Sequence, residues 1–385
     1  MAILNSILDT DLYKLTMMKA VLDFYQNILV RYVFSNRRPE GKFNKEFADA
    51  FRRELEAMRT LRLTEEEARW LARECPFLGL EYIAYLKGYE YNPDEVEFEI
   101  KDGELNLSVE GSWDRTILWE VPLMAIISEL YFTHCDKNWD YCGRSYQAQH
   151  LEKTKILSGS MWADFGTRRR RAYCVQDLVV GASKGQPGFV GTSNVHLAHK
   201  NGVKPIGTMA HEWVMGISAL EGLRYANRHA LRIWSEIYQG NLGIALPDTF
   251  GSDAFFKDFD LYLAKLFDGI RHDSGNPIVF GNRVISHYKS LGIDPMSKVI
   301  VFSDGLDPVT VLEIGDRFRG KIKTSFGIGT NFTNDIDGSP ALNMVIKMWS
   351  CNGIPVVKLS DSKGKQMGDA DALRVANWTF TGQPL

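Results

Sequence analysis

Residues 160 to about 330 repeat one structural unit, and this repeat limits the folds open to the chain more than any other feature. Short apolar segments alternate with helical segments at a spacing of roughly 25–35 residues, the size of one strand and one helix. Such alternation predicts parallel strands joined by crossover helices. The predicted strands end at residues 164–166, 189–191, 206–207, 245–247, 270–271, 302–304 and 326–327. No G-x-G-x-x-G follows the first of them, so a closed or nearly closed α/β barrel of about seven strands is favoured over an open sheet.

The first part of the chain, residues 1–158, has a different pattern and is predicted to form an N-terminal α+β domain with connecting helices. Residues 96–100 and 105–109 alternate apolar and polar side chains around Asp102 and Gly103, which indicates a β-hairpin. Apolar residues at helical spacing follow Asp11 and indicate a first helix that packs against another element.

The last part of the chain, residues 339–385, is predicted to leave the barrel of residues 159–338 and to rejoin the N-terminal domain. Residues 341–349 are expected to form a helix, and residues 354–359 a strand.

The composition argues against several classes of protein. The 385 residues carry a formal net charge of −3, which argues against nucleic-acid binding as the main function. Five cysteines without a C-x-x-C pair argue against a disulfide framework or a structural zinc site. The N-terminus shows no signal-peptide pattern, and no charge-free apolar stretch is long enough to span a membrane. We therefore expect a soluble cytoplasmic protein that binds neither nucleic acid nor membranes.

Unusual polar residues gather directly after the predicted strands. They occupy residues 164–169, 191–194, 207–213, 248–249, 271–275, 303–307 and 326–331. The loops after the strands of an α/β barrel lie on one face, and that face carries the active site. Each cluster by itself is equally well explained by turn and helix-capping chemistry. Capping alone does not explain why all of them follow the strands at the same end.

His211 stands between a predicted strand, residues 203–206, and a helix that starts near Glu212. Backbone N–H groups and the positive end of a helix favour anions at such a junction, and phosphate in particular. A neutral imidazole there can attack phosphorus as a nucleophile. The alternative is a structural histidine that is satisfied by local hydrogen bonds.

The content of the other clusters points to phosphate and ribose. Glycine-rich turns at residues 191–194 and 327–331 present N–H groups to a phosphate. Asp248 and Asp273 can hold ribose hydroxyls or a phosphate-bound Mg²⁺. Either aspartate is alternatively a helix N-cap.

Arginines supply the matching positive charge. Arg168, Arg169 and Arg271 are suited to bidentate binding of anions. For residues 168–171, a solvated charge run is the alternative. We expect Arg168 to face the site and the later arginines mostly to point away.

Together these clusters resemble the motif set of the nicotinate phosphoribosyltransferases, over nearly the whole chain. The resemblance rests on TDLYK at residues 10–14, DFGTRR at 164–169, GTSN at 191–194, GTMAHEW at 207–213, RHDSG at 271–275 and FGIGT at 326–330. It implies an N-terminal α/β domain, an irregular seven-stranded α/β barrel of the TIM-barrel type, and a homodimer with active sites shared between subunits. The implied reaction makes nicotinate mononucleotide from nicotinate and 5-phosphoribosyl 1-diphosphate, with ATP as a co-substrate and Mg²⁺ as the metal.

The resemblance also assigns roles to individual positions. Tyr13, reaching over from a neighbouring subunit, and Phe165 would enclose the pyridine ring from its two faces. The remaining implied roles are nicotinate binding by Arg271 and Thr208, diphosphate binding by Arg168, ribose binding by Asp273, a 5′-phosphate cradle of Gly305, Gly329 and Thr330, and transient phosphorylation of His211 by ATP.

Ser193 is expected to discriminate between related substrates. Family members that use nicotinamide carry an aspartate at this position, whose charge would repel nicotinate, and serine removes that repulsion. A nicotinamide phosphoribosyltransferase is the alternative enzyme, and a non-catalytic pyridine or nucleotide sensor on the same fold is the alternative outside enzymes. The roles of His196, His199 and His272 stay open.

The expected mechanism needs no general base, because the pyridine nitrogen already has a free lone pair when it attacks C1 of the ribose. Positioning and charge stabilisation remain, with Asp273 beside the cationic C1 and the diphosphate on arginine and Mg²⁺. Mg²⁺ is expected to bind through substrate phosphates, with Asp273 or Asp248 nearby. His211, with an ordinary pKa of about 6.5, is largely neutral and nucleophilic at pH 7.

Overall fold

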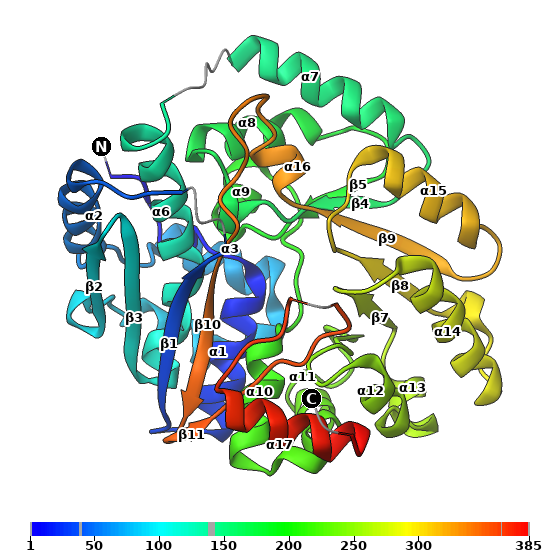
Figure 1. Cartoon of the computed structure of the whole chain (residues 1–385). Helices are drawn as coiled ribbons and strands as arrows, with labels where there is room; N and C mark the ends of the chain where they lie inside the picture. Colours follow the sequence, from blue (N-terminus) through cyan, green and yellow to red (C-terminus); the bar gives the residue numbers. More distant parts are fainter. Residues whose placement is uncertain (1, 38–40, 138–142, 363, 384–385) are drawn as a thin grey trace.

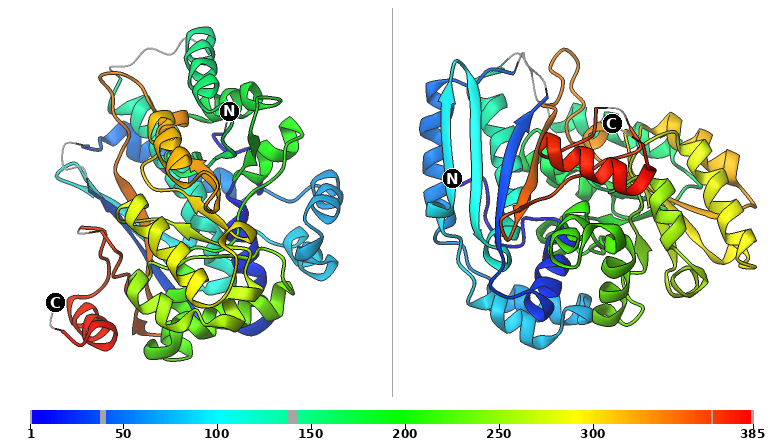
Figure 2. Two further views of the ribbon diagram at one scale, coloured as in Figure 1. Left: turned by 90° about the vertical axis from the view of Figure 1, so that its right-hand side faces the viewer. Right: turned by 60° about the horizontal axis from the view of Figure 1, so that its bottom comes forward.

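The computed structural model describes residues 2–37, 41–137, 143–362 and 364–383. These residues form two separate β-sheets with helices packed against both (Figure 1). Figure 2 shows the N-terminal sheet standing at one side of the molecule, beside the second sheet and its helices. The predicted α/β class is confirmed.

The N-terminal sheet is antiparallel and has five strands, in the order β11-β10-β1-β3-β2. Its strands are β1 (Leu29–Asn36), β2 (Val96–Lys101), β3 (Glu104–Ser112), β10 (Met344–Cys351) and β11 (Ile354–Pro355). β2 and β3 form the predicted hairpin. Asp102 and Gly103 form its turn with φ of 52° and 77°, and a two-residue hairpin loop of type I′ requires positive φ at both positions.

The first region also contains helices, and some of them pack against this sheet. They are α1 (Leu12–Phe24), α2 (Lys45–Met58), α3 (Glu65–Glu74), α4 (Leu80–Lys87), α5 (Trp113–Thr116) and α6 (Glu120–His134). The continuous helical stretch 113–134 is long and apolar enough to cross a membrane, but 89% of its most apolar window is buried inside the protein. Its apolar character is therefore explained by its place in the core.

The second sheet is parallel and has six strands, in the order β5-β4-β9-β8-β7-β6. Its strands are β4 (Trp162–Asp164), β5 (Phe189–Thr192), β6 (Ile244–Ala245), β7 (Gly269–His272), β8 (Val299–Phe302) and β9 (Lys323–Ile328). Further helices lie before, between and after these strands. They are α7 (Gly143–Ile156), α8 (Tyr173–Ser183), α9 (Val195–Asn201), α10 (His211–Leu220), α11 (Ala226–Tyr238), α12 (Ser252–Asp258), α13 (Leu261–Leu266), α14 (Pro277–Ser290), α15 (Pro308–Phe318), α16 (Thr330–Thr333) and α17 (Ala370–Thr381).

The expected closed or nearly closed barrel of seven strands is not confirmed, because the described residues form six parallel strands and no closed barrel. The predicted strand at residues 203–206 is reduced to one parallel bridge between Pro205 and Thr192 of β5. Pro205 has no N–H to donate to a further strand. Within the described part of the chain, no strand pairing joins the edge strands β5 and β6.

The expected helix at residues 341–349 is also wrong, because most of this segment is strand β10. β10 lies between β1 and β11, with Met344 opposite Asn36 and Cys351 opposite Val30. Pairing with a strand some three hundred residues earlier thus overrides the local pattern, as is common for strands. The expected strand at residues 354–359 forms only at β11. Domain boundaries at residues 158 and 338 stay predictions.

The chain after β11 crosses back to the carboxyl ends of the parallel strands. A bridge between Lys358 and Met367 closes a loop, and we call residues 358–362 and 364–367 the C-terminal strap. The strap docks through the N–H of Leu359, which donates to the carbonyl of Thr249 at 2.8 Å. It thereby places residues of the tail next to the strand-end loops.

Candidate active site

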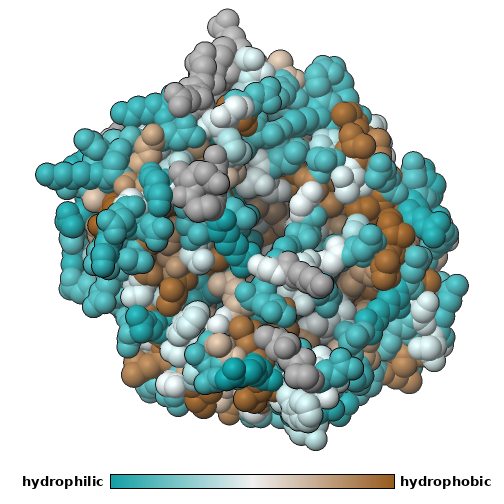
Figure 3. All heavy atoms as spheres, in the orientation of Figure 1, coloured by the Kyte–Doolittle hydropathy of each residue, from teal (hydrophilic) through white to brown (hydrophobic). Residues whose placement is uncertain are grey.

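A cleft of about 980 Å³ opens between the carboxyl ends of the parallel strands, the strap and strand β10. Most of the predicted site residues line it together. These are Tyr13, Phe165, Arg168, His211, Arg271, Asp273, Gly305, Gly329 and Thr330. The face shown in Figure 3 has a hollow near its centre that is bordered largely by hydrophilic residues. The strand-end clusters therefore meet in one place.

Three predicted site residues do not line the cleft. The Ser193 hydroxyl donates to Oδ1 of Asp11 at 2.7 Å, and both residues are buried. Thr208 is held by its neighbours, because its carbonyl accepts from Thr16 Oγ1 at 2.6 Å. Asp248 is buried beneath His211 and accepts a hydrogen bond from Ser274 at 2.6 Å.

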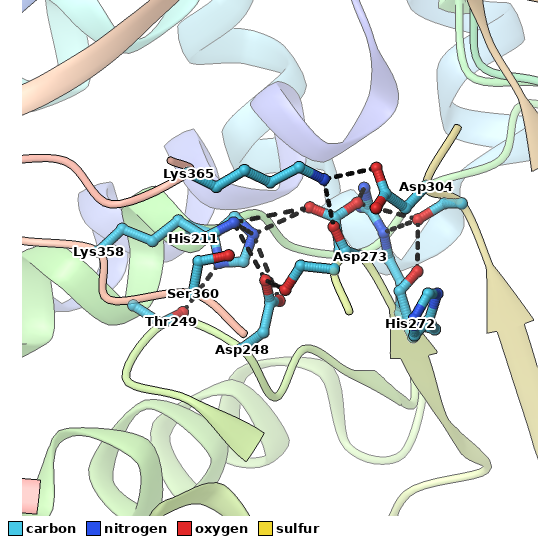
Figure 4. A network of polar contacts seen from close by, with 12 residues as sticks. His211, Asp248, Thr249, His272, Asp273, Asp304, Lys358, Ser360 and Lys365 are labelled. Atoms are coloured by element: carbon cyan, nitrogen blue, oxygen red, sulfur yellow. Dashed lines mark hydrogen bonds and ion pairs between the residues drawn. The ribbon is translucent and has the colours of Figure 1, made fainter. Parts of the chain in front are cut away.

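His211 is the centre of a polar network in the cleft (Figure 4). Its Nε2 lies 3.0 Å from Oδ2 of Asp273, 2.8 Å from Nζ of Lys358 and 3.5 Å from Oδ1 of Asp248. Its Nδ1 lies 3.0 Å from the hydroxyl of Thr249. His211 is the first residue of α10, and the preceding Ala210 supplies no side-chain cap.

The electrostatics of this centre keep the imidazole neutral and the nearest acid ionised. Burial, followed by the charge of Lys358, holds the pKa of His211 below its ordinary value. Burial acts to raise the pKa of Asp273, but Arg271 and the other neighbouring donors outweigh it and bring the pKa well below its ordinary range. A neutral imidazole is the nucleophilic form, so the centre is set up for attack on an electrophile.

His211, Asp248 and Asp273 together present a possible metal-binding group, with ligand atoms within 4.8 Å of one another. Lys358 already places its ammonium group there, 3.1 Å from Oδ2 of Asp248. Mg²⁺ also prefers an all-oxygen octahedral set with several waters, whereas this group offers an imidazole nitrogen in a buried setting. The three residues therefore do not fit a resident Mg²⁺.

Two aromatic side chains of the cleft each stand beside an arginine. The Arg168 guanidinium lies 5.9 Å from the centre of the Tyr13 ring, and that of Arg271 lies 6.0 Å from the Phe165 ring. The Phe165 ring packs directly on Gly327, where a Cβ atom would approach it to 2.2 Å. Only glycine leaves room for the ring in that position.

Tyr13 stands at the start of α1, beside the cleft. Tyr13 lines the cleft of its own chain, and its expected reach into the site of a neighbouring subunit stays a prediction. The start of α1 is held there because the N–H of Leu12 donates to the carbonyl of Ser193 at 2.8 Å, and Asp11 bridges to Asn194.

The four arginines at residues 168–171 are not a solvated charge run. Arg168 and Arg169 both line the cleft, so Arg169 joins Arg168 there. Arg170 is fully buried and binds the two carboxylate oxygens of Asp9 at 2.8 Å each. Arg171 is fully buried as well and contacts Ser339. The last two arginines therefore hold the fold together.

Several cleft residues were not predicted, and most of them come from the C-terminal tail. Lys347 on β10 and Lys358, Lys365 and Met367 of the strap all line the cleft. The Lys365 ammonium bonds to Asp304 at 2.5 Å and lies 3.3 Å from the carbonyl of Asp273. Lys347 was missed because its segment was predicted to be a helix. Nothing local in the sequence marks the strap lysines as site residues.

The three histidines left open take structural positions. His272 is buried, with its ring 5.0 Å and 5.5 Å from the rings of Phe280 and Phe302. His196 lies 3.1 Å from the hydroxyl of Tyr173, and His199 lies beside Trp70. None of the three lines the cleft.

A second network of charges lies on the other side of α10. Lys14 is fully buried and pairs with Glu120 at 2.7 Å and with Glu212. Glu212 also accepts from Trp113 Nε1 at 2.8 Å and from the hydroxyl of Tyr32. Glu120 extends the network to the cleft, because Lys347 and Arg168 lie 3.4 Å and 3.5 Å from its Oε1.

Comparisons with known proteins cover both regions of the fold. A model of the nicotinate phosphoribosyltransferase (NAPRTase) family matches residues 161–383, and a model of that family's N-terminal domain matches residues 8–128. A nicotinate phosphoribosyltransferase of Methanosarcina mazei is 50% identical over 397 residues, which covers 97% of this chain and 98% of that protein. One from Chromohalobacter salexigens is 47% identical and covers 97% of each chain. The crystal structure of nicotinate phosphoribosyltransferase from Porphyromonas gingivalis matches with a TM-score of 0.94 and 38% identity, over 98% of this chain and 100% of that one.

Proposed function

The chain belongs to the nicotinate phosphoribosyltransferase family, and from this premise we propose how its cleft makes nicotinate mononucleotide. The enzyme joins nicotinate to the phosphoribosyl group of 5-phosphoribosyl 1-diphosphate and releases diphosphate, a step of NAD synthesis. The observation that carries the proposal is one cleft that combines the Phe165–Arg271 pair with the His211–Asp273 centre.

The pyridine ring of nicotinate is proposed to lie against Phe165, with Tyr13 as the second aromatic wall. Arg271 binds the carboxylate. Its Nε and Nη2 already donate to Ser303 and Asp273 at 2.8 Å and 2.7 Å, which holds the guanidinium in place. Among the described residues, Nη1 has no partner and is free to donate to the substrate carboxylate, a charge-assisted bond.

Asp273 then supports the transfer itself. The pyridine nitrogen attacks C1 of the ribose as the bond from C1 to the diphosphate oxygen breaks, and positive charge develops at C1. Asp273 stays ionised because of Arg271 and the other donors around it, so it can stabilise this charge. No proton moves in this step, so the reaction needs no general base.

The diphosphate and the 5′-phosphate of 5-phosphoribosyl 1-diphosphate are proposed to bind to two different groups of cleft residues. Arg168 receives the diphosphate, and Gly305, Gly329 and Thr330 receive the 5′-phosphate through their N–H groups. Mg²⁺ is proposed to enter bound to the diphosphate. When bound, the metal would neutralise charge on the leaving group.

ATP is proposed to phosphorylate His211 during the cycle. The nitrogen that faces the cleft is Nε2, because Nδ1 is turned to Thr249. Nε2 forms a bond to the γ-phosphorus as the bond from that phosphorus to the bridging oxygen breaks, and ADP leaves with the electron pair. Water later attacks the phosphohistidine and restores the imidazole. Phosphorylation is proposed to tighten substrate binding, and hydrolysis to release the product.

Nicotinate is favoured over nicotinamide, but the structure changes the argument from Ser193. A carboxylate is already present at this place, because Ser193 donates to the buried Asp11. Burial raises the pKa of Asp11, and Arg168 at 4.0 Å opposes this shift. Ser193 therefore avoids a second acid beside Asp11.

A homodimer in the cytoplasm remains part of the proposal. It is supported by the family resemblance, and Tyr13 lines the cleft of its own chain as well.

Product formation tests the proposed function. Purified protein is supplied with 5-phosphoribosyl 1-diphosphate, Mg²⁺ and either nicotinate or nicotinamide, each with and without ATP. We expect nicotinate mononucleotide, more of it with ATP, together with ADP. Chelation of Mg²⁺ should stop the transfer. Product from nicotinamide alone would overturn the substrate assignment, and no product from either substrate would favour a non-catalytic sensor.

A further inference from the structure

Thr249 is a residue of the His211 centre to which neither the sequence nor the proposed reaction assigns a role. It follows Asp248 in the loop after β6, is completely buried, and holds its hydroxyl 3.0 Å from Nδ1 of His211. Its backbone carbonyl is fixed by the N–H of Leu359 in the strap. The side chain and the main chain of Thr249 are thus tied to two different partners.

The contacts of His211 cannot all be satisfied by one protonation pattern. A neutral imidazole has one N–H and one nitrogen lone pair. Nε2 lies near an acceptor, Asp273 at 3.0 Å, and near a donor, Lys358 at 2.8 Å. If Nε2 carries the hydrogen, it donates to Asp273 and has no lone pair for Lys358. If Nδ1 carries the hydrogen, Nε2 accepts from Lys358, and its single lone pair is free for a phosphoryl donor once that ammonium group moves aside.

The hydroxyl of Thr249 can serve either pattern, and the second one depends on it as the acceptor of the Nδ1 hydrogen. A threonine hydroxyl both donates and accepts, so it can receive the Nδ1 hydrogen. The hydrogen bond made by one ring nitrogen determines which form the other nitrogen takes. Lys358 acts in the same direction from the other side of the ring.

We propose that Thr249 is a positioning residue that accepts the Nδ1 hydrogen of His211 and thereby presents an unprotonated Nε2 to the phosphoryl donor. This inference rests on the proposed phosphorylation of His211. In that step the Nε2–phosphorus bond forms and the bond to the bridging oxygen of ATP breaks. The Nδ1 hydrogen stays in place, so no proton has to leave the ring before attack. Asp248 and Asp273 face the positive charge that the ring then carries.

The tautomer of His211 can be measured directly by ¹⁵N NMR of the ring nitrogens. Full-length protein labelled with ¹⁵N-histidine is compared with Thr249→Val and Thr249→Ser, and His211→Ala identifies the signals. Valine has the shape of threonine without the hydroxyl and keeps the backbone contact to Leu359. Asp248, Asp273 and Lys358 are the charged groups that face the ring, and they are unchanged in both variants.

We expect the neutral wild-type ring to carry its hydrogen on Nδ1. Thr249→Val should shift the hydrogen toward Nε2, where Asp273 accepts it, and Thr249→Ser should restore the wild-type form. Phosphorylation of His211 by γ-labelled ATP should fall about tenfold in Thr249→Val, the effect of one hydrogen bond, and recover in Thr249→Ser.

A wild-type ring with its hydrogen on Nε2 would overturn the proposal, whether or not the valine variant folds. An unchanged tautomer in Thr249→Val would do the same. If ATP did not label wild-type His211, the phosphorylation step of the proposed function would fail, and the NMR comparison would still decide the role of Thr249.

Discussion

His211 and Glu212 are consecutive residues, yet they belong to two buried polar networks of opposite character. Glu212 faces the N-terminal region, where Lys14, Trp113 and Tyr32 all bond to its carboxylate. His211 faces the cleft. Here, among the described residues, Oδ1 of Asp248 is buried without a hydrogen-bond partner, and Nε2 of His211 has competing neighbours.

The difference separates a structural network from a reactive one. Around Glu212, every charge has an opposite charge and the carboxylate oxygens have donors, so the network has one stable arrangement. Around His211, an acceptor has no hydrogen-bond partner among the described residues, and no single tautomer satisfies every neighbour of the ring. Polar groups of that kind are expected where charge moves during a reaction. Glu212 thus fixes the start of α10 through its structural network, and with it the neighbouring His211.

Removing His211 should have the largest effect on activity. We expect this effect to be confined to the network that faces the cleft. His211→Ala is expected to abolish substrate-stimulated ATP hydrolysis and to leave a slow, ATP-independent transfer to nicotinate. ADP release and product formation are measured on the same sample. ATP hydrolysis by His211→Ala that still responds to substrate would show that another group accepts the phosphate.

Removing Glu212 should act on stability instead. Glu212→Leu leaves the Lys14 ammonium with a single acid and strands the donors of Tyr32 and Trp113. Breaking such a buried pair costs about 3–5 kcal/mol of unfolding free energy. Denaturant unfolding measures the loss. Glu221→Ala, directly after the end of the same helix, is the matched control, because the bond of Glu221 to Tyr25 is exposed and is expected to cost below about 1 kcal/mol.

Removing Lys358 should alter the pH dependence of the reactive network. Burial and Lys358 both lower the pKa of His211, so His211 is expected to stay neutral, and the ATP-dependent step to stay active, below the ordinary imidazole pKa of about 6.5. Lys358→Met removes one of the two causes, so the pKa of His211 should rise. The acid limb of ATP-dependent labelling should then move to higher pH. If the acid limb of labelling lay at the same pH in Lys358→Met as in the wild type, Lys358 would not act on the pKa of His211.

Local sequence predicted the cleft side of the molecule best. The predicted strand ends brought Arg271, Asp273 and His211 into one cleft, because the carboxyl ends of parallel strands meet at one edge. The predicted hairpin of β2 and β3 formed because Asp102 and Gly103 accept positive φ.

Contacts between distant parts of the chain could not be predicted in this way. Residues 344–351 have an apolar pattern that suits a helix as well as a strand, and only pairing with β1 decides between them. Lys358 and Lys365 reach the cleft because the tail returns to it, which no local pattern shows. The buried pairs of Lys14 and Arg170 also depend on partners far away in the sequence.

Phosphate transfer to paired variants is the most direct test of the separation between the two networks. Wild-type protein, His211→Gln and Glu212→Gln are each incubated with ATP, and covalent phosphate is located by mass spectrometry under conditions that preserve phosphohistidine. We predict phosphate on His211 in the wild type and in folded Glu212→Gln, and none in His211→Gln. Phosphate on His211→Gln, or its loss from a folded Glu212→Gln that binds ATP, would contradict the division of roles between the two residues.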